Sequence, residues 1–416
     1  MFDRHYDVIV AGAGSAGVAA AVGAAQAGAK VLLVERAGFA GGAATLAQVL
    51  AWCGFYPQRT GKVPEPVVGG VGRQALNHLA ALGIDVVPYF SSSGNWPIRL
   101  NPEATKLALD RTLVECGAQV ALHCDLSGVT GANGRIESVA LRDPRGVSEV
   151  SADAFVDATG EAELAFLAGA TQCPLHGEAS KCQPASFPLR ISGVAEGTPI
   201  DKEARAAALA GMERNIGRAG LRADGGIITT LPGTSDLWWL TIEVETNGLD
   251  ALDLAQAERD ARALAWRAVL QLRKVPGFER VCLSSTGPKI GIRESRHAKT
   301  VSPLKEKTLL TGERPHDTIA LGGWPMEIHH GSGRAEYRKI GGDGIYGIPI
   351  GALRSGDITN LLLAGRCLGA EPAAFASARV MGTAFATGHA AGIAAAMHNA
   401  SVDDLRRELL RQGALI

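Results

Sequence analysis

The chain has 416 residues, a length that suits two packed domains rather than a single core. Hydrophobic residues make up 46% and charged residues 20% of it, a globular composition that excludes an intrinsically disordered protein. The formal net charge of −1 lacks the basic surplus of nucleic-acid-binding proteins, so we expect no nucleic-acid partner.

The first predicted elements are a strand, a turn, a helix and a second strand. The apolar run over 8–10 is typical of a buried parallel strand, and its early position predicts that no signal peptide is present. A helix of small residues follows over 15–27 and ends at Gly28. The second strand, over 31–34, is followed directly by Glu35. This order is that of a dinucleotide-binding unit.

The turn between the first strand and the helix has the sequence Gly-Ala-Gly-Ser-Ala-Gly over 12–17. Gly12 permits a tight turn, Gly14 lets a pyrophosphate approach the backbone, and Gly17 lets helix and strand pack closely. Glu35 is placed to bind the ribose hydroxyls and would repel a 2′-phosphate, which disfavours NADP. A plain glycine-rich turn is the alternative, but the surrounding strand, helix and acid favour dinucleotide binding.

A second block, also mixed α/β, follows. An amphipathic helix is predicted to begin at Asn101-Pro102-Glu103 and to end at Gly117. Strands are predicted over 119–123, 136–142 and 149–156, with a hairpin turn at 132–134.

The pattern changes from about Thr171. Strands predicted over 186–192, 226–231 and 237–245 read as antiparallel, and a long charged helix follows over 252–274. We interpret this region as a substrate-covering domain inserted into the nucleotide-binding fold.

The chain then returns to the nucleotide-binding pattern, with a buried strand over 360–365 and a helix over 377–397. That helix is rich in Ala and Gly and contains Arg379, so we expect a core helix and no membrane span. The predicted fold is α/β. A discontinuous Rossmann-like domain occupies 1–170 and 346–416, and a mixed or antiparallel β-plus-helix substrate domain occupies 171–345.

Further motifs extend the fingerprint beyond Glu35. Arg36 and the run Gly-Gly-Ala-Ala-Thr over 41–45 resemble the extended fingerprint of the flavoproteins related to glutathione reductase and fumarate reductase. More specifically, the chain resembles the FAD-dependent oxidoreductase family (the FAD_oxidored group). The matching segments follow in order at 157–164, 291–296, 346–353, 364–367 and 402–407.

The resemblance implies that the cofactor is FAD rather than NAD. Together with the fingerprint it predicts FAD contacts at Gly12, Gly14, Ser15, Ala16, Gly17, Glu35, Arg36, Gly42, Ala43, Thr45, Ala158, Thr159, Gly160, Gly365, Arg366, Gly382 and Thr383.

The chain departs from flavin hydroxylases and halogenases. Hydroxylases usually have Gly-Asp where this chain has Gly365-Arg366, and the W-x-W-x-I-P helix of halogenases is missing. A second G-x-G-x-x-G is also missing, which argues against a built-in NAD(P)H domain. We therefore expect hydride transfer rather than oxygen activation, with an external electron acceptor such as oxygen, a quinone or a carrier protein.

Two arginines are candidates for anchoring a substrate or the flavin. Arg293 lies in a polar run over 291–297, and Arg379 is predicted to begin the last helix. Their forked guanidinium groups match two carboxylate oxygens. The alternatives are a solvated turn with an Arg–Glu pair for Arg293 and simple packing against Glu371 for Arg379.

His329 is the candidate acid/base, because histidine titrates near neutral pH. A structural or exposed histidine is the alternative, and His330 is the weaker candidate. His329, His330 and Glu327 lack a third ligand at suitable spacing, so we expect no metal. Cys367 could act in redox or covalent chemistry or be a small buried residue.

The sequence therefore predicts a cytoplasmic, FAD-dependent dehydrogenase of a small oxygenated molecule. Seven scattered cysteines without a C-x-x-C pair are typical of reduced thiols. A flavin-dependent C=C reductase is the alternative within enzymes. A non-catalytic FAD-binding or RNA-associated protein is the alternative from another class, and an NAD-linked enzyme without flavin is a third.

Overall fold

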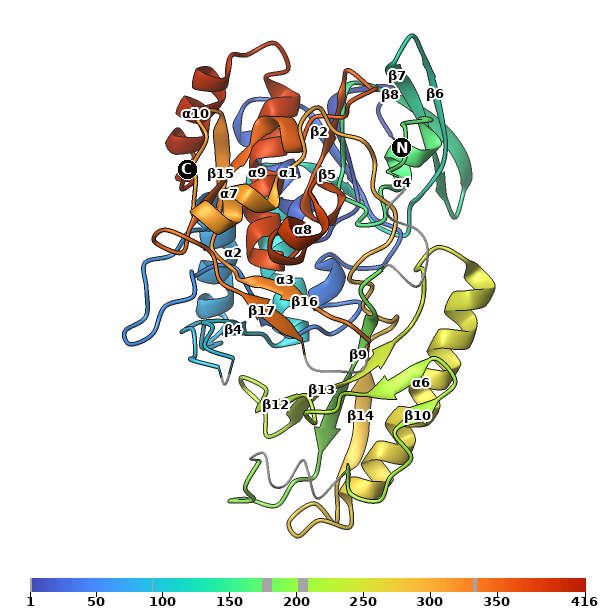
Figure 1. Cartoon of the computed structure of the whole chain (residues 1–416). Coiled ribbons are helices and arrows are strands. Elements are labelled where there is room, and N and C mark those ends of the chain that lie inside the picture. Colours follow the sequence, from blue (N-terminus) through green and yellow to red (C-terminus); the bar gives the residue numbers. More distant parts are fainter. Residues whose placement is uncertain (1, 92, 174–181, 201–208, 332–334) are drawn as a thin grey trace.

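The computed structural model describes residues 2–91, 93–173, 182–200, 209–331 and 335–416 (Figure 1). Its central sheet has five parallel strands in the order β5-β2-β1-β8-β19. These strands are β1 (His5–Ala11), β2 (Val31–Val34), β5 (Gln119–Ala121), β8 (Gly146–Asp157) and β19 (Leu361–Leu363). Because they are parallel, their carboxyl ends lie at one edge of the sheet, where ligands of such folds bind.

An antiparallel ribbon of β6 (Asp125–Ala132) and β7 (Arg135–Asp143) extends this sheet. β7 pairs with the first half of β8, and β19 pairs with its last three residues on the same side. Asn133 and Gly134 at the ribbon's turn both have positive φ, of 53° and 69°, as a two-residue hairpin of this hand requires. The predicted turn at 132–134 is confirmed.

Two helices pack against one face of the central sheet, α1 (Ser15–Gln26) and α9 (Met381–Ala396) (Figure 1). A Cβ at Gly388 or Gly392 would collide with the backbone of α1, so glycine permits this close contact. Val8 and Val10 of β1 face these helices, whereas Ile9 and Ala11 face the core under the β6–β7 ribbon. Both faces of the sheet are therefore buried, as the apolar runs predicted.

The prediction of one helix over 377–397 is wrong. The chain forms α8 (Pro372–Ala378) and α9, with Arg379 at the carboxyl end of α8. Val380 is extended, with φ −72° and ψ 152°. The N–H of Gly382, in the first turn of α9, donates to the carbonyl of Cys53 at 2.7 Å rather than to a carbonyl of α8.

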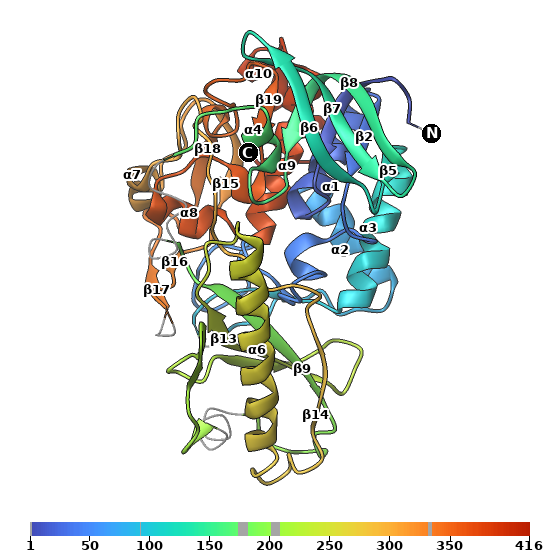
Figure 2. The ribbon, with the colours of Figure 1, turned by 90° about the vertical axis from the view of Figure 1, so that its right-hand side faces the viewer.

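A second, antiparallel sheet has the order β10-β11-β13-β9-β14, with β12 paired to β13. The long helix α6 (Ala251–Leu272) covers it and closes a hydrophobic core of its own (Figure 2). The predicted strands and helix of this region are confirmed within a few residues. The strands are β9 (Ala185–Ser192), β10 (Asn215–Ile216), β11 (Ala219–Leu221), β12 (Ile227–Thr230), β13 (Leu237–Val244) and β14 (Cys282–Thr286).

The remaining elements pack around the first core. Leu304, Ile319 and Ile348 lie in the same hydrophobic cluster as α1 and α9, whereas the second cluster runs from Ala185 to Ile290. The domain limits at 171 and 346 stay a prediction. These elements are β3 (Ala51–Trp52), α2 (Gly70–Ala81), β4 (Ile98–Arg99), α3 (Pro102–Cys116), α4 (Glu163–Leu167), α7 (Glu306–Thr311), β15 (Thr318–Gly322), β16 (Met326–Ile328), β17 (Glu336–Arg338), β18 (Tyr346–Pro349) and α10 (Val402–Arg411).

Within the described residues, no helix combines the length and the apolar character needed to cross a membrane.

Candidate active site

A long cavity lies at the carboxyl edge of the central sheet and encloses about 1010 Å³, part of it open to solvent. The strand ends and the turns that follow them form its wall. Most of the predicted cofactor contacts line it: Gly12, Gly14, Ser15, Ala16, Glu35, Arg36, Gly42, Ala43, Ala158, Thr159, Gly160, Gly365 and Arg366.

The glycine-rich turn fits a dinucleotide. Gly12 has φ 89°, and a Cβ there would lie 2.7 Å from the carbonyl of Ala158. Gly14, by contrast, has open space where a Cβ would point, the nearest atom being Gly42 Cα at 3.9 Å. No side chain caps α1, and the buried hydroxyl of Ser15 has no hydrogen-bond partner. The helix therefore presents free donors to a phosphate.

The carboxylate of Glu35 is held in place by two backbone N–H groups. Its Oε2 accepts from Ala13 N and its Oε1 from Ala37 N, both at 2.8 Å. The side chain is buried, yet it lines the cavity. Each carboxylate oxygen keeps a second lone pair, which can accept a ribose hydroxyl.

A charged cluster forms the wall beside Gly160. Arg366 Nη2 donates to Glu161 Oε1 at 2.9 Å, and Arg36 lies 3.7 Å from both Glu161 and Glu163. Burial raises the pKa of Glu161, but Arg366, Lys289 and Arg36 outweigh it and bring that pKa below its ordinary value. For Lys289, a cation, burial has the opposite effect and lowers the pKa. Lys289 was not predicted from the sequence because it belongs to no fingerprint motif.

Four predicted contacts pack behind the cavity wall rather than lining it: Gly17, Thr45, Gly382 and Thr383. A Cβ at Gly17 would collide with Gly12, and the hydroxyl of Thr45 donates to the carbonyl of Ala40 at 2.8 Å. Thr383 is fully buried, and its hydroxyl has no partner. Their roles toward the cofactor stay predictions.

A second cavity encloses about 1000 Å³, part of it open to solvent, and residues of β9, β12 and β13 in the antiparallel sheet line it. Part of its wall is apolar and includes Ile227, Trp238 and Leu240. The indole N–H of Trp238 donates to Gln48 O at 2.8 Å, so the ring presents no unpaired polar atom. The two cavities share part of their walls, and the shared residues are Ala43, Gly291, Ile292, Arg366, Arg379 and Met381.

Arg293 and Arg379, the predicted anchors, both line this second cavity. Arg293 Nη1 donates to Pro184 O at 2.5 Å and lies 3.4 Å from Glu243 Oε1. Burial lowers the pKa of Arg293 to about 10; Glu243 opposes this shift and Arg379 adds to it. Arg379 Nη2 donates to Gln183 Oε1 at 3.3 Å and to Glu327 O at 3.2 Å.

His329 also lines the second cavity, with both ring nitrogens against carboxylates. Nδ1 lies 2.7 Å from Glu243 Oε1, and Nε2 lies 3.2 Å from Glu327 Oε1. Tyr337 donates its hydroxyl to the same Glu327 oxygen at 2.9 Å. Although burial raises the pKa of Glu327, the hydrogen bond from His329 and the nearby cations hold it far below its ordinary value. Burial raises the pKa of Tyr337.

Sequence reasoning missed Arg222, Glu243 and Tyr337. Arg222 follows β11 and is bound to β13 through the bond from its N–H to Thr241 O. Tyr337 lies opposite Glu327 in the pairing of β16 with β17. Strand pairing brings Arg222 and Tyr337 to the wall of the cavity, and Glu243 lies beside two residues of that wall, Arg293 and His329.

Cys367 does not line either cavity. It is fully buried, and its sulfur accepts from Gly160 N at 3.2 Å and lies 3.5 Å from Asp157 Oδ1. Burial raises the pKa of its thiol well above the ordinary value. This environment favours the alternative of a small packed residue.

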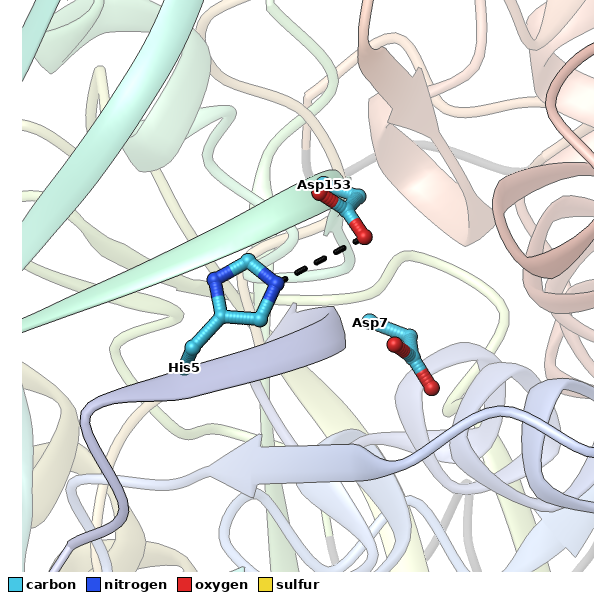
Figure 3. A group of neighbouring side chains, drawn as sticks. All are labelled: His5, Asp7 and Asp153. Carbon is cyan, nitrogen blue, oxygen red and sulfur yellow. Dashed lines mark ion pairs between the residues drawn. The ribbon is translucent and has the colours of Figure 1, made fainter.

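Across the part of the chain that the structure describes, His5, Asp7 and Asp153 are the one group of three side chains close enough to hold a metal (Figure 3). His5 Nε2 lies 3.5 Å from Asp153 Oδ2, and all three residues are exposed. The group lies at the amino end of β1, whereas Gly12 follows the carboxyl end. It has no connection with the cavities.

Several solved structures are similar to this chain. OxyS anhydrotetracycline hydroxylase from Streptomyces rimosus is 15% identical, with a TM-score of 0.48 over 97% of this chain and 64% of that one. A geranylgeranyl bacteriochlorophyll reductase-like protein from Thermoplasma acidophilum is 14% identical, with a TM-score of 0.48 over 98% and 82%. CabE, an aromatic hydroxylase from angucycline biosynthesis, is 12% identical, with a TM-score of 0.50 over 97% and 65%.

This chain spans less than two thirds of the OxyS and CabE chains. At 12% identity the similarity to CabE supports the fold alone. Among curated protein sequences no match was found. The sequence model described as "FAD dependent oxidoreductase", however, matches residues 7–412. This match runs from β1 into α10, and the glycine-rich turn lines the cavity at the carboxyl ends of the strands. Together these findings establish the family and its cofactor, FAD. This protein belongs to the FAD-dependent oxidoreductase family.

Proposed function

We propose that the protein transfers a hydride between a small oxygenated substrate and FAD, in the direction of substrate oxidation. The observation that carries this proposal is the shared wall of the two cavities, which Gly291, Ile292, Arg379 and Met381 help to form. A substrate in the second cavity would meet the end of the cofactor that reaches this wall. Bound FAD supplies the hydride acceptor, and the protein orients the substrate and receives its proton.

The carboxylates around His329 support a site that handles the proton of the substrate. His329 lies between Glu327 and Glu243. Glu327 stays ionised at neutral pH because its pKa is held low despite burial, so it holds the imidazole in place rather than taking up a proton itself. We propose that His329 acts in acid/base chemistry at the substrate and that Glu327 positions it.

The two arginines supply positive charge close to the reaction site. Arg379 lines both cavities, and Arg293 lies behind it in the wall of the second. Negative charge that develops on the substrate oxygen or on the flavin during transfer is stabilised by such preorganised cations. We assign Arg293 and Arg379 to anchoring the substrate or the flavin edge.

The first test is the visible absorption spectrum of the purified protein, followed by anaerobic addition of small alcohols and hydroxy acids. Bleaching of the flavin band by such a compound is the expected result, and Glu327→Gln should slow it. Reoxidation of reduced enzyme by activated alkenes alone would identify a C=C reductase instead. Flavin that is reduced by dithionite but by no organic donor would support the non-catalytic alternative.

The electron acceptor is tested in the same preparation. Reduced enzyme is mixed with oxygen, a soluble quinone or a one-electron carrier, and the return of the flavin band is timed. The compound that restores the flavin band fastest is then assigned as the electron acceptor.

A further inference from the structure

We infer that the substrate carries a carboxylate that binds Arg379, and an apolar body that lies against Trp238. This inference rests on the proposed function and adds the chemical class of the substrate. Four observations lead to it: the pairing of the cavity's arginines, an unpaired donor, the repulsion between the cations, and the apolar wall opposite them.

Three of the four arginines that line the second cavity already have a carboxylate partner. Arg222 donates to both oxygens of Asp224, from Nε at 3.0 Å and from Nη2 at 2.8 Å. Arg366 is bound to Glu161 at 2.9 Å, and Arg293 lies 3.4 Å from Glu243. Each of these three arginines therefore has an opposite charge beside it.

Arg379 differs from the other three. Its Nη2 donates only to neutral oxygens, those of the Gln183 amide and the Glu327 backbone. Its Nε is buried and has no hydrogen-bond partner among the described residues. A buried guanidinium donor without an acceptor is costly, and a carboxylate oxygen is the acceptor that suits it best. Arg379 is therefore the arginine of this cavity that is best placed to bind a carboxylate of the substrate.

The surrounding charges favour the same anion. Burial lowers the pKa of Arg293, and Arg379 and Arg222 lower it further. Arg293 is thus repelled by both of the other guanidinium groups, although Glu243 and Glu327 attract it. A carboxylate bound to Arg379 offsets the charge that this arginine directs at Arg293, whereas a neutral alcohol or amide does not.

The apolar wall opposite the arginines indicates which kind of group forms the rest of the substrate. Ile227, Trp238, Leu240 and Val380 line the second cavity, and the indole N–H of Trp238 is already bound to Gln48 O. An apolar body is favoured there because it buries apolar surface without leaving a polar group unpaired. The substrate class is an organic acid with an apolar skeleton.

The test uses oxidised holoenzyme and needs no turnover. Benzoate and cyclohexanecarboxylate, with benzamide as the neutral counterpart of benzoate, are titrated while the flavin spectrum and the heat of binding are recorded. We expect both carboxylates to bind and benzamide to bind at least about tenfold more weakly, as the loss of a charged hydrogen bond predicts. Equal binding of benzoate and benzamide would overturn the inference.

Variants locate the carboxylate. Arg379→Met should weaken benzoate binding about tenfold to a hundredfold, and Arg379→Lys should restore part of it. Arg314→Met removes an exposed arginine that pairs with Asp343 and serves as the matched control. FAD content is measured on each variant. Unchanged benzoate binding with altered FAD affinity in Arg379→Met would assign Arg379 to the flavin instead and would contradict the inference.

The inference and the proposed function fail separately. Carboxylate binding without reduction of the flavin by any organic donor would sustain the inference and overturn the proposed function. Reduction by neutral alcohols in a protein that binds no carboxylate would do the reverse.

Discussion

Nδ1 of His329 lies 2.7 Å from Oε1 of Glu243, and both side chains are buried. The other ring nitrogen lies 3.2 Å from Glu327. Both contacts can be hydrogen bonds at once only if the ring carries two protons or one carboxylate is protonated. Glu243 is placed to orient the imidazole of His329, in the way that a buried carboxylate orients histidine in other catalytic sites.

Replacing this carboxylate should slow the chemistry more than it disturbs cofactor binding. Glu243→Gln keeps an oxygen near His329 but removes the charge that faces both His329 and Arg293. We expect the rate of flavin reduction by the substrate to fall about tenfold or more, since hydrogen bonds to charged groups contribute about 1.5–3 kcal/mol. Stopped-flow absorbance under anaerobic conditions measures that rate.

Glu245→Gln is the matched control, because Glu245 is two residues away but exposed. An equal rate in Glu243→Gln and wild type, with FAD content unchanged in both, would remove Glu243 and His329 from the proposed proton path.

The lowered pKa of Glu327 predicts how the stability of the protein depends on pH. In the folded protein this pKa lies below 4.5, the ordinary value for glutamate, so the ionised form of Glu327 stabilises the fold. That stabilisation is complete above pH 4.5 and is lost as the pH falls toward the folded pKa. The difference in unfolding temperature between wild type and Glu327→Gln should therefore shrink between pH 6 and pH 3. Circular dichroism measures it, and the exposed Glu313→Gln is the control.

A constant difference in unfolding temperature across that range would mean that the contribution of Glu327 comes from its hydrogen bonds to Tyr337 and Trp324 rather than from its charge.

Local patterns in the sequence were enough to predict the dinucleotide site. The residues around Gly12 and Glu35 are fixed by one strand–turn–helix–strand unit, in which neighbouring positions dictate each other's conformation. The same is true of α6, whose apolar spacing repeats over its whole length. Such elements need no knowledge of distant contacts.

The second cavity could not be predicted in the same way. Tyr337 reaches Glu327 only through the pairing of β16 with β17, and Arg222 depends on its bond to Thr241. The break before α9 likewise follows from the bond of Gly382 to Cys53, which is remote in sequence. His329 and Arg293 were named from their residue types and from the resemblance of their segments to the family. Their catalytic roles stay predictions.

Lys289 provides a test of the charged cluster beside the cofactor cavity. It lines that cavity with Arg36 and Arg366, where a pyrophosphate would need positive charge. Lys289→Met should raise the dissociation constant for FAD about tenfold, measured by the fluorescence of released flavin. Lys274→Met, at an exposed position, is the control. An unchanged dissociation constant would place the phosphates away from Lys289.

The same lysine predicts how FAD binding responds to pH. Burial lowers the pKa of Lys289, so it loses its charge at a lower pH than an exposed lysine. FAD affinity of the wild type should therefore fall as the pH rises into the alkaline range, and Lys289→Met should lose that part of the dependence. Parallel titration curves for the two proteins would contradict this assignment.

Gly12 and Gly14 allow packing and cofactor binding to be separated within one turn. Gly12→Ala should lower the unfolding temperature even without FAD, because φ is 89° and the added methyl group would lie 2.7 Å from Ala158 O. Gly14 has φ −69° and ψ −176°, which alanine can adopt, and its added methyl group would enter the cavity. Gly14→Ala should therefore leave the FAD-free protein as stable as the wild type but weaken FAD binding. Calorimetry on both forms measures the two effects, and FAD binding of wild-type strength in Gly14→Ala would show that the dinucleotide does not approach the backbone at this glycine.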